Sequence, residues 1–187
     1  MDVLTHVFIP LTIAYVLRPD LFPTPRYLAL GMFGLLPDLD KLLGVPGLLH
    51  SLVTVVPICL GVIAVGHWYR GDSTYGVLAS AFVMSHLLLD VIEGVPVPLL
   101  FPIVSTGVGL SYPMSVVFGA DVGLLGFTFQ GSPVSLEVGE IQTGHAVDPE
   151  VDTNTFGFVN GTGIMSALVF LTVYVGLQRT EQDVGAL

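Results

Sequence analysis

Apolar residues gather in five segments separated by short polar linkers. They cover residues 3–17, 27–36, 48–69, 74–92 and 163–177. The third and fourth match the roughly 20 residues with which an α-helix crosses the hydrocarbon core of a bilayer. The first two are shorter, and we expect them to tilt, to thin the bilayer locally or to pack as a hairpin inside the bundle. The pattern predicts an all-α membrane protein, a bundle of about five short transmembrane helices.

Two further segments depart from this pattern. Residues 95–120 are apolar but contain four prolines, which interrupt helical hydrogen bonding. We expect a broken or re-entrant segment there, with a full span as the alternative. Residues 121–161 carry six acidic residues and no Lys or Arg, and the pieces 124–129 and 134–138 have strand-like composition. They predict an acidic extramembrane loop, irregular and partly β, within a single membrane domain over residues 1–187.

The composition supports a membrane protein and excludes one class of partner, the nucleic acids. The chain is 52% hydrophobic and only 11% charged, with a mean hydropathy of +0.83, whereas a soluble domain carries about a quarter charged residues. Its net charge is −10 and it has one lysine, so it offers no basic patch for a nucleic acid. We therefore expect membrane lipids, and no nucleic acid, as partners. The acid-rich, lysine-poor composition resembles that of proteins from salt-loving archaea.

The few basic residues suggest an orientation in the membrane. With five spans and an outside N-terminus, Arg18, Arg26, Arg70 and Arg179 all fall on the inside, and Lys41 is the exception. The positive-inside rule favours this arrangement. It predicts a multi-pass protein of the inner or plasma membrane whose acidic loop lies on the outer face.

Six ionisable residues lie near the ends of the first four spans. They are His6 at the start of the first, Asp38 and Asp40 at the end of the second, His50 at the start of the third, and His86 and Asp90 near the end of the fourth. Because successive spans alternate in direction, all six converge at one membrane face, the outer one in this orientation. Ionisable groups are costly in hydrocarbon, so such a gathering indicates a functional site.

The residue types suit a metal ion. Imidazole nitrogen and carboxylate oxygen are ligands for Zn, Mn and Fe, and the four-residue spacing of His86 and Asp90 puts both on one helix face. Each residue alone has a simpler alternative. Asp38 and Asp40 could cap the following helix, and His86 with Asp90 could be a hydrogen-bonded pair between helices. Chance, however, would scatter the six over both faces. His67, beside Trp68, lies at the opposite face and fits an interfacial belt.

The order and spacing of these residues resemble the YdjM-like family. The shared pattern is Thr5-His6, Leu36-Pro37-Asp38-Leu39-Asp40, His50-Ser51 and His86-Leu87-Leu88-Leu89-Asp90. The resemblance covers about residues 1–105. It implies an inner-membrane metal-dependent hydrolase, in a family also described as LexA-binding and distantly similar to zinc-dependent phospholipase C. Residues 45–49 contain no His or Arg, although members often carry a His-Arg pair there, which speaks against a second metal or an anion-binding arginine.

The likeness to the phospholipase implies roles for these residues. Asp38, His50, His86 and Asp90 would hold one divalent metal ion, with Zn the first choice, and His6 would be a further ligand. We assign Asp40 to the catalytic set as the carboxylate that orients a neighbouring histidine. The expected function is a membrane-bound metal-dependent hydrolase acting on phosphoester or lipid-like substrates. The alternative is a non-enzymatic role in metal binding, transport or protein interaction.

Overall fold

The computed structural model describes residues 2–43, 45, 47–118, 127–140, 146–147, 154–155 and 159–185. The helical elements are α1 (Val3–Leu17), η1 (Pro19–Leu21), η2 (Pro25–Leu35), α2 (Leu39–Leu42), α3 (Leu52–Arg70), α4 (Thr74–Ile92) and α5 (Gly161–Gly185), where η denotes a 3-10 helix. The strands are β1 (Thr106–Ser111), β2 (Ser115–Phe118), β3 (Phe127–Gln130), β4 (Ser135–Glu140), β5 (Ala146–Val147) and β6 (Asn154–Thr155).

Three helices are long and apolar enough to cross a membrane. They are α3, α4 and the first 19 residues of α5, Gly161–Arg179. α1 has 15 residues and η2 has 11. At a rise of about 1.5 Å per residue in an α-helix and about 2.0 Å in a 3-10 helix, both extend roughly 22 Å. This is less than the roughly 30 Å of a hydrocarbon core, so a count of five full spans stays a prediction.

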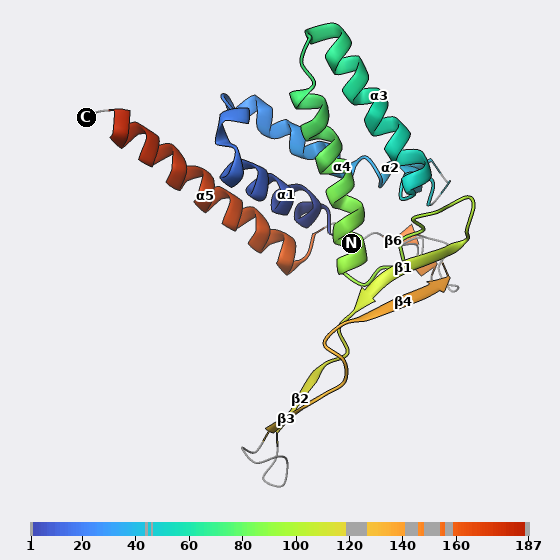
Figure 1. Ribbon diagram of the computed structural model, residues 1–187. Helices are drawn as coiled ribbons and strands as arrows, with labels where there is room; N and C mark the ends of the chain where they lie inside the picture. The colour runs from blue at the N-terminus through green and yellow to red at the C-terminus, as the bar shows by residue number, and fades with distance from the viewer. Residues whose placement is uncertain are drawn as a thin grey trace.

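The helices pack in the spatial order α5, α1, η2, α4 and α3 (Figure 1). Glycines allow η2 to lie close to α1. A Cβ added at Gly34 would come within 2.6 Å of the carbonyl oxygen of His6, and one at Gly31 would contact Leu11. The main core cluster comprises Leu11, Tyr15, Phe22, Leu78, Phe82 and Phe170. Many apolar side chains of α3 face outward, as expected of a helix that lies against lipid.

Antiparallel strands connect α4 to α5 and extend away from the helices (Figure 1). β1 pairs with β4, with Thr106 opposite Glu140, and β2 pairs with β3. The described part of residues 95–120 therefore forms β1 and β2 and contains no helix, so the alternative of a full helical span is wrong. The expected strand pieces overlap β3 at residues 127–129 and β4 at residues 135–138. Residue 134 precedes β4, and residues 124–126 fall outside the described residues. Proline explains the missing helix, because it removes a backbone donor and clashes with the preceding turn.

Asp2 ties the start of α1 to the start of α5. Its carboxylate accepts hydrogen bonds from the backbone N–H of Thr5 at 3.1 Å and from that of Asn160 at 3.2 Å. At the other end of the two helices, Gln178 donates to the hydroxyl of Tyr15 at 3.2 Å. α1 and α5 are therefore parallel neighbours, and the positive ends of both helix dipoles face one buried carboxylate.

We expect Gly163→Ala to destabilise the protein. A Cβ at position 163 would overlap the Asp2 carboxylate, and overpacking of this kind costs about 1–3 kcal/mol. Thermal unfolding in detergent should show a lower midpoint than that of the wild type. Gly61→Ala is the matched control, because a Cβ at Gly61 in α3 meets nothing within 4 Å. Equal midpoints for the two variants would contradict the close contact between α5 and Asp2.

Candidate metal centre

The structure brings the six ionisable residues together at one end of the helix bundle. His6 lies near the start of α1, and His50 immediately precedes the cap of α3. Asp38 lies between η2 and α2, and Asp40 lies in α2. His86 and Asp90 lie towards the end of α4. All are buried except Asp38, whose side chain is 26% exposed. Asp38 therefore lies at the open side of the group. His67 lies at the opposite end of α3 and is exposed. The remaining histidine, His145, belongs to the acidic segment 121–161 and is outside the described residues.

Each of the three histidine rings is fixed through its Nδ1 atom. The contacts are His6 Nδ1 to the carbonyl oxygen of Asp2 at 2.9 Å, His50 Nδ1 to Asp40 Oδ2 at 2.9 Å, and His86 Nδ1 to the carbonyl oxygen of Gly34 at 2.6 Å. Carbonyl and carboxylate oxygens accept hydrogen bonds, so each Nδ1 carries the proton and donates it. The Nε2 atom of each ring then has a free lone pair, the form in which histidine binds a metal.

The Nε2 atoms converge with two carboxylates. His86 Nε2 lies 3.3 Å from both His50 Nε2 and Asp90 Oδ2, and His6 Nε2 lies 2.9 Å from Asp90 Oδ1. Asp38 Oδ1 is 3.7 Å from the Nε2 atoms of both His50 and His86. Ligands about 2.0–2.2 Å from a shared ion lie roughly 3–4 Å from one another. The spacings of these atoms therefore suit the ligands of a metal ion.

Two features of these converging side chains indicate that a cation would stabilise them. The Nε2 atoms of His50 and His86 are both acceptors when their Nδ1 atoms donate, and two acceptors repel each other at 3.3 Å. Asp90 Oδ2 is buried without a hydrogen-bond donor, although it lies only 3.3 and 3.5 Å from these two nitrogens. A buried carboxylate oxygen of this kind is normally paired or bound to a metal. The residues present therefore fit a divalent cation.

Geometry favours one ion over two. Two triads could each hold a metal: His6, His86 and Asp90, and Asp38, His50 and His86. Both need His86. The Nδ1 atom of this ring is already bonded to the Gly34 carbonyl, so its Nε2 is the single atom that can bind a metal. Two carboxylates, Asp38 and Asp90, would balance the two charges of the ion.

Asp40 lies behind His50, away from the converging atoms. Its Oδ2 accepts hydrogen bonds from His50 Nδ1 and from the backbone N–H groups of Gly47 at 2.9 Å and Leu49 at 3.1 Å. Burial raises the pKa of the Asp40 carboxyl, but these hydrogen bonds outweigh burial and hold the pKa below its ordinary value. Asp40 is thus an ionised carboxylate in the position that orients His50. Asp38 precedes α2 but makes no side-chain capping hydrogen bond, which argues against a capping role.

A family model for the YdjM inner membrane protein matches residues 1–183. The chain belongs to the YdjM inner membrane protein family. The match runs well beyond the first 105 residues of the sequence resemblance and includes the acidic segment and most of α5. Neither the curated proteins nor the solved structures gave a match. YdjM membership places the chain in an inner-membrane family, and the chemistry must be argued from the site, because a fold does not fix a reaction.

Three contributors to this YdjM-family site were missed in the sequence. Two are the backbone carbonyls of Asp2 and Gly34, which orient His6 and His86. A carbonyl oxygen belongs to every residue type, so no sequence signal points to them. The third is Lys41, whose Nζ pairs with Asp38 Oδ1. Its signal was available, because it is the chain's one lysine and lies three residues after Asp38.

We expect Asp40→Asn to weaken metal binding without abolishing it. An amide cannot hold the His50 ring as a carboxylate does, and loss of such an orienting group typically costs about 10–100-fold in metal affinity. Competition with a zinc chelator would measure this affinity. Asp20→Asn serves as the control, because Asp20 is exposed and pairs with Arg18 at the other end of the bundle. Affinities equal to that of the wild type for both variants would show that Asp40 does not orient a ligand.

Proposed function

We propose that this YdjM-family protein is a membrane-bound metal-dependent hydrolase of phosphoesters, with one Zn-like ion held by His6, Asp38, His50, His86 and Asp90. The observation that carries the proposal is the convergence of three histidine Nε2 atoms on Asp90 and Asp38, with every Nδ1 held by an oxygen. A hydrogen-bonded His86–Asp90 pair alone would not explain why His50 and Asp38 are also directed at it.

The chain's own residues suit such a reaction. A divalent ion bound here would supply Lewis acidity, polarising a phosphoryl oxygen and lowering the pKa of a water from about 15.7 towards 7. His6, His86 and Asp90 are rigidly placed by two packed helices, and Asp40 fixes His50. Asp38, the most exposed of the proposed ligands, marks the side from which a substrate enters.

The proline-containing segment after α4 covers the site next to His50. The carbonyl oxygen of Leu99 accepts hydrogen bonds from the backbone N–H of Leu52 at 2.9 Å and from the Ser51 hydroxyl at 3.2 Å. A Cβ at Gly47 would lie 3.1 Å from the Pro98 ring. This segment therefore shields the buried side of the candidate site from water and leaves the Asp38 side accessible.

A non-enzymatic role in metal binding, transport or protein interaction is the second candidate. Transporters place ionisable residues near the middle of the membrane at the ends of broken helices. Here the group lies at the ends of α1, α3 and α4, and the structure shows no second ionisable cluster along the described parts of these helices. This placement favours a site open to one membrane face.

Elemental analysis of the purified protein tests the metal centre. We expect about one Zn-like ion per chain in the wild type and none in His86→Ala or Asp90→Asn, because each substitution removes a central ligand. His67→Ala should retain the metal, since His67 lies at the far end of α3. Metal retained in both ligand variants would place the site elsewhere and make the pair structural. Stoichiometric metal without hydrolysis of any phosphomonoester or phosphodiester would favour the non-enzymatic role.

We further propose that the site and the acidic segment face outward from the inner membrane. Arg18, Arg26, Arg70 and Arg179 all lie at the end of the bundle opposite the site, and positive residues favour the cytoplasmic side. Reporter fusions after Arg70 should report a cytoplasmic location, and fusions within residues 121–161 should report an external one. A cytoplasmic acidic segment would reverse the orientation and leave the metal centre itself unaffected.

A further inference from the structure

The two carboxylates proposed as metal ligands are held in different ways. Asp90 is fully buried in α4, and its oxygens lie within 3.5 Å of one nitrogen from each of the three histidines. Asp38 lies between η2 and α2, and its side chain is 26% exposed. Its Oδ1 is 3.7 Å from the Nε2 atoms of His50 and His86. Asp38 is therefore the more weakly held of the two carboxylates.

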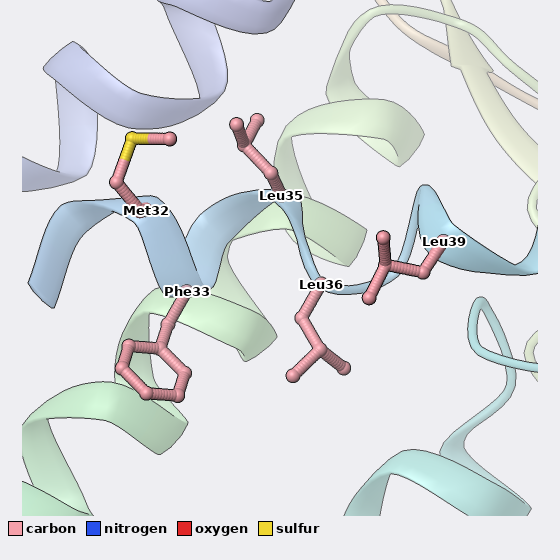
Figure 2. A pocket seen from close by; sticks show the side chains of 5 residues that line it. All are labelled: Met32, Phe33, Leu35, Leu36 and Leu39. Atoms are coloured by element: carbon pink, nitrogen blue, oxygen red, sulfur yellow. The ribbon is translucent and has the colours of Figure 1, made fainter.

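The chain around Asp38 is also more loosely packed than the chain around Asp90. Leu36 and Leu39, on either side of Asp38, line an apolar hollow of about 420 Å³ (Figure 2). Leu39 is 46% exposed, whereas Leu87, in the turn of α4 before Asp90, is 2% exposed. A segment with few buried contacts rearranges at low cost. The Asp38 side chain can therefore turn without disturbing the packed core around Asp90.

Lys41 gives Asp38 a cationic partner of its own. The Lys41 ammonium pairs with Asp38 Oδ1, the same oxygen that faces the Nε2 atoms of His50 and His86. Lys41 lies three residues after Asp38, and its side chain is only 9% exposed, so the ammonium is kept beside the carboxylate. An ammonium and a metal ion at the histidines would thus compete for one carboxylate oxygen.

A hydrolytic metal centre needs a coordination position that its own side chains do not fill. Zn²⁺ takes four ligands and sometimes five, and catalytic sites keep one position for water or substrate. Five resident side chains would leave none. Departure of Asp38 from the ion costs little in charge, because Lys41 neutralises the freed carboxylate and a phosphoester brings a negative charge of its own.

We propose that Asp38 is the exchangeable ligand of the metal centre, and that Lys41 is the positioning residue that holds the Asp38 carboxylate while a substrate anion takes its place. This rests on the metal centre of the proposed function and assigns separate roles to its ligands. The permanent ligands are the histidines fixed through Nδ1 and the carboxylate in α4, namely His6, His50, His86 and Asp90.

Two matched substitutions test which carboxylate is exchangeable. Asp38→Asn and Asp90→Asn make the same chemical change, and competition with a chelator measures the zinc affinity of each full-length variant in detergent. We expect Asp38→Asn to keep one ion per chain with about tenfold weaker affinity, and Asp90→Asn to lose the ion. Equal loss of zinc in the two variants would overturn the proposal and leave the hydrolase function in place. A wild type that binds no zinc would overturn both.

Lys41→Met tests the competition for Asp38. The variant removes the ammonium and keeps a long apolar side chain, so zinc should bind about tenfold more tightly. A purely structural lysine predicts the opposite, a loss of affinity. Lys41→Arg keeps the positive charge and should restore the affinity of the wild type. Weaker zinc binding in a Lys41→Met protein that unfolds at the wild-type temperature would contradict the competition and overturn the proposal.

Inorganic phosphate, titrated against the zinc-loaded proteins, tests the exchange itself. Lys41→Met should bind phosphate about tenfold more weakly, because the displaced Asp38 carboxylate then has no partner. In the Asp38→Asn background the same substitution should change phosphate affinity by about threefold or less, since no carboxylate remains to be displaced. An equal loss in both backgrounds would show that Lys41 contacts phosphate directly and would overturn the proposal. The expected pattern without hydrolysis of any phosphoester would refute the hydrolase and keep the exchangeable ligand.

Discussion

Five ionisable side chains packed at the end of apolar helices must balance one another's charge, and this constraint organises the fold around them. Asp90 and His86 are fully buried, and His6 and His50 nearly so. Isolated charges in such surroundings would be prohibitively costly. The three rings meet the constraint in the same way. Each donates a hydrogen bond from its Nδ1–H to an oxygen and turns its Nε2 towards the carboxylates. A divalent ion at the centre would complete this balance with two carboxylate charges.

Close helix packing is what makes this geometry possible. The carbonyl of Gly34 reaches His86 because η2 lies against both α1 and α4 without a side chain at that position. A larger residue at position 34 would strike the backbone of His6. The same glycine therefore lets α1, which carries His6, approach η2 and supplies the oxygen that orients His86 on α4. Helix packing and the orientation of His86 therefore depend on the same residue, because close-packed interiors transmit small displacements.

The shared location of the six ionisable residues could be predicted, because it depends only on the order and alternating direction of the helices. Asp40 could be predicted to orient a histidine because a carboxylate side chain is visible in the sequence. The 3-10 form of η2 could not be predicted. The apolar run at residues 27–36 does not show whether each backbone N–H bonds to the carbonyl three or four residues earlier. The pairing of β1 with β4 could not be predicted from composition. It joins an apolar segment to an acidic one, and composition assigns these two segments to different parts of the protein.

The bond between Asp2 and Asn160 has a consequence for how the protein is made. Ribosomal synthesis proceeds from the N-terminus, so His6, Asp38, His50, His86 and Asp90 all emerge before residue 160 does. The Asp2 carboxylate accepts from Asn160 as well as from Thr5, and the Asp2 carbonyl orients His6. The nascent chain can thus bring these five residues together early, but the contact that anchors α1 against α5 forms only after residue 160 has been made.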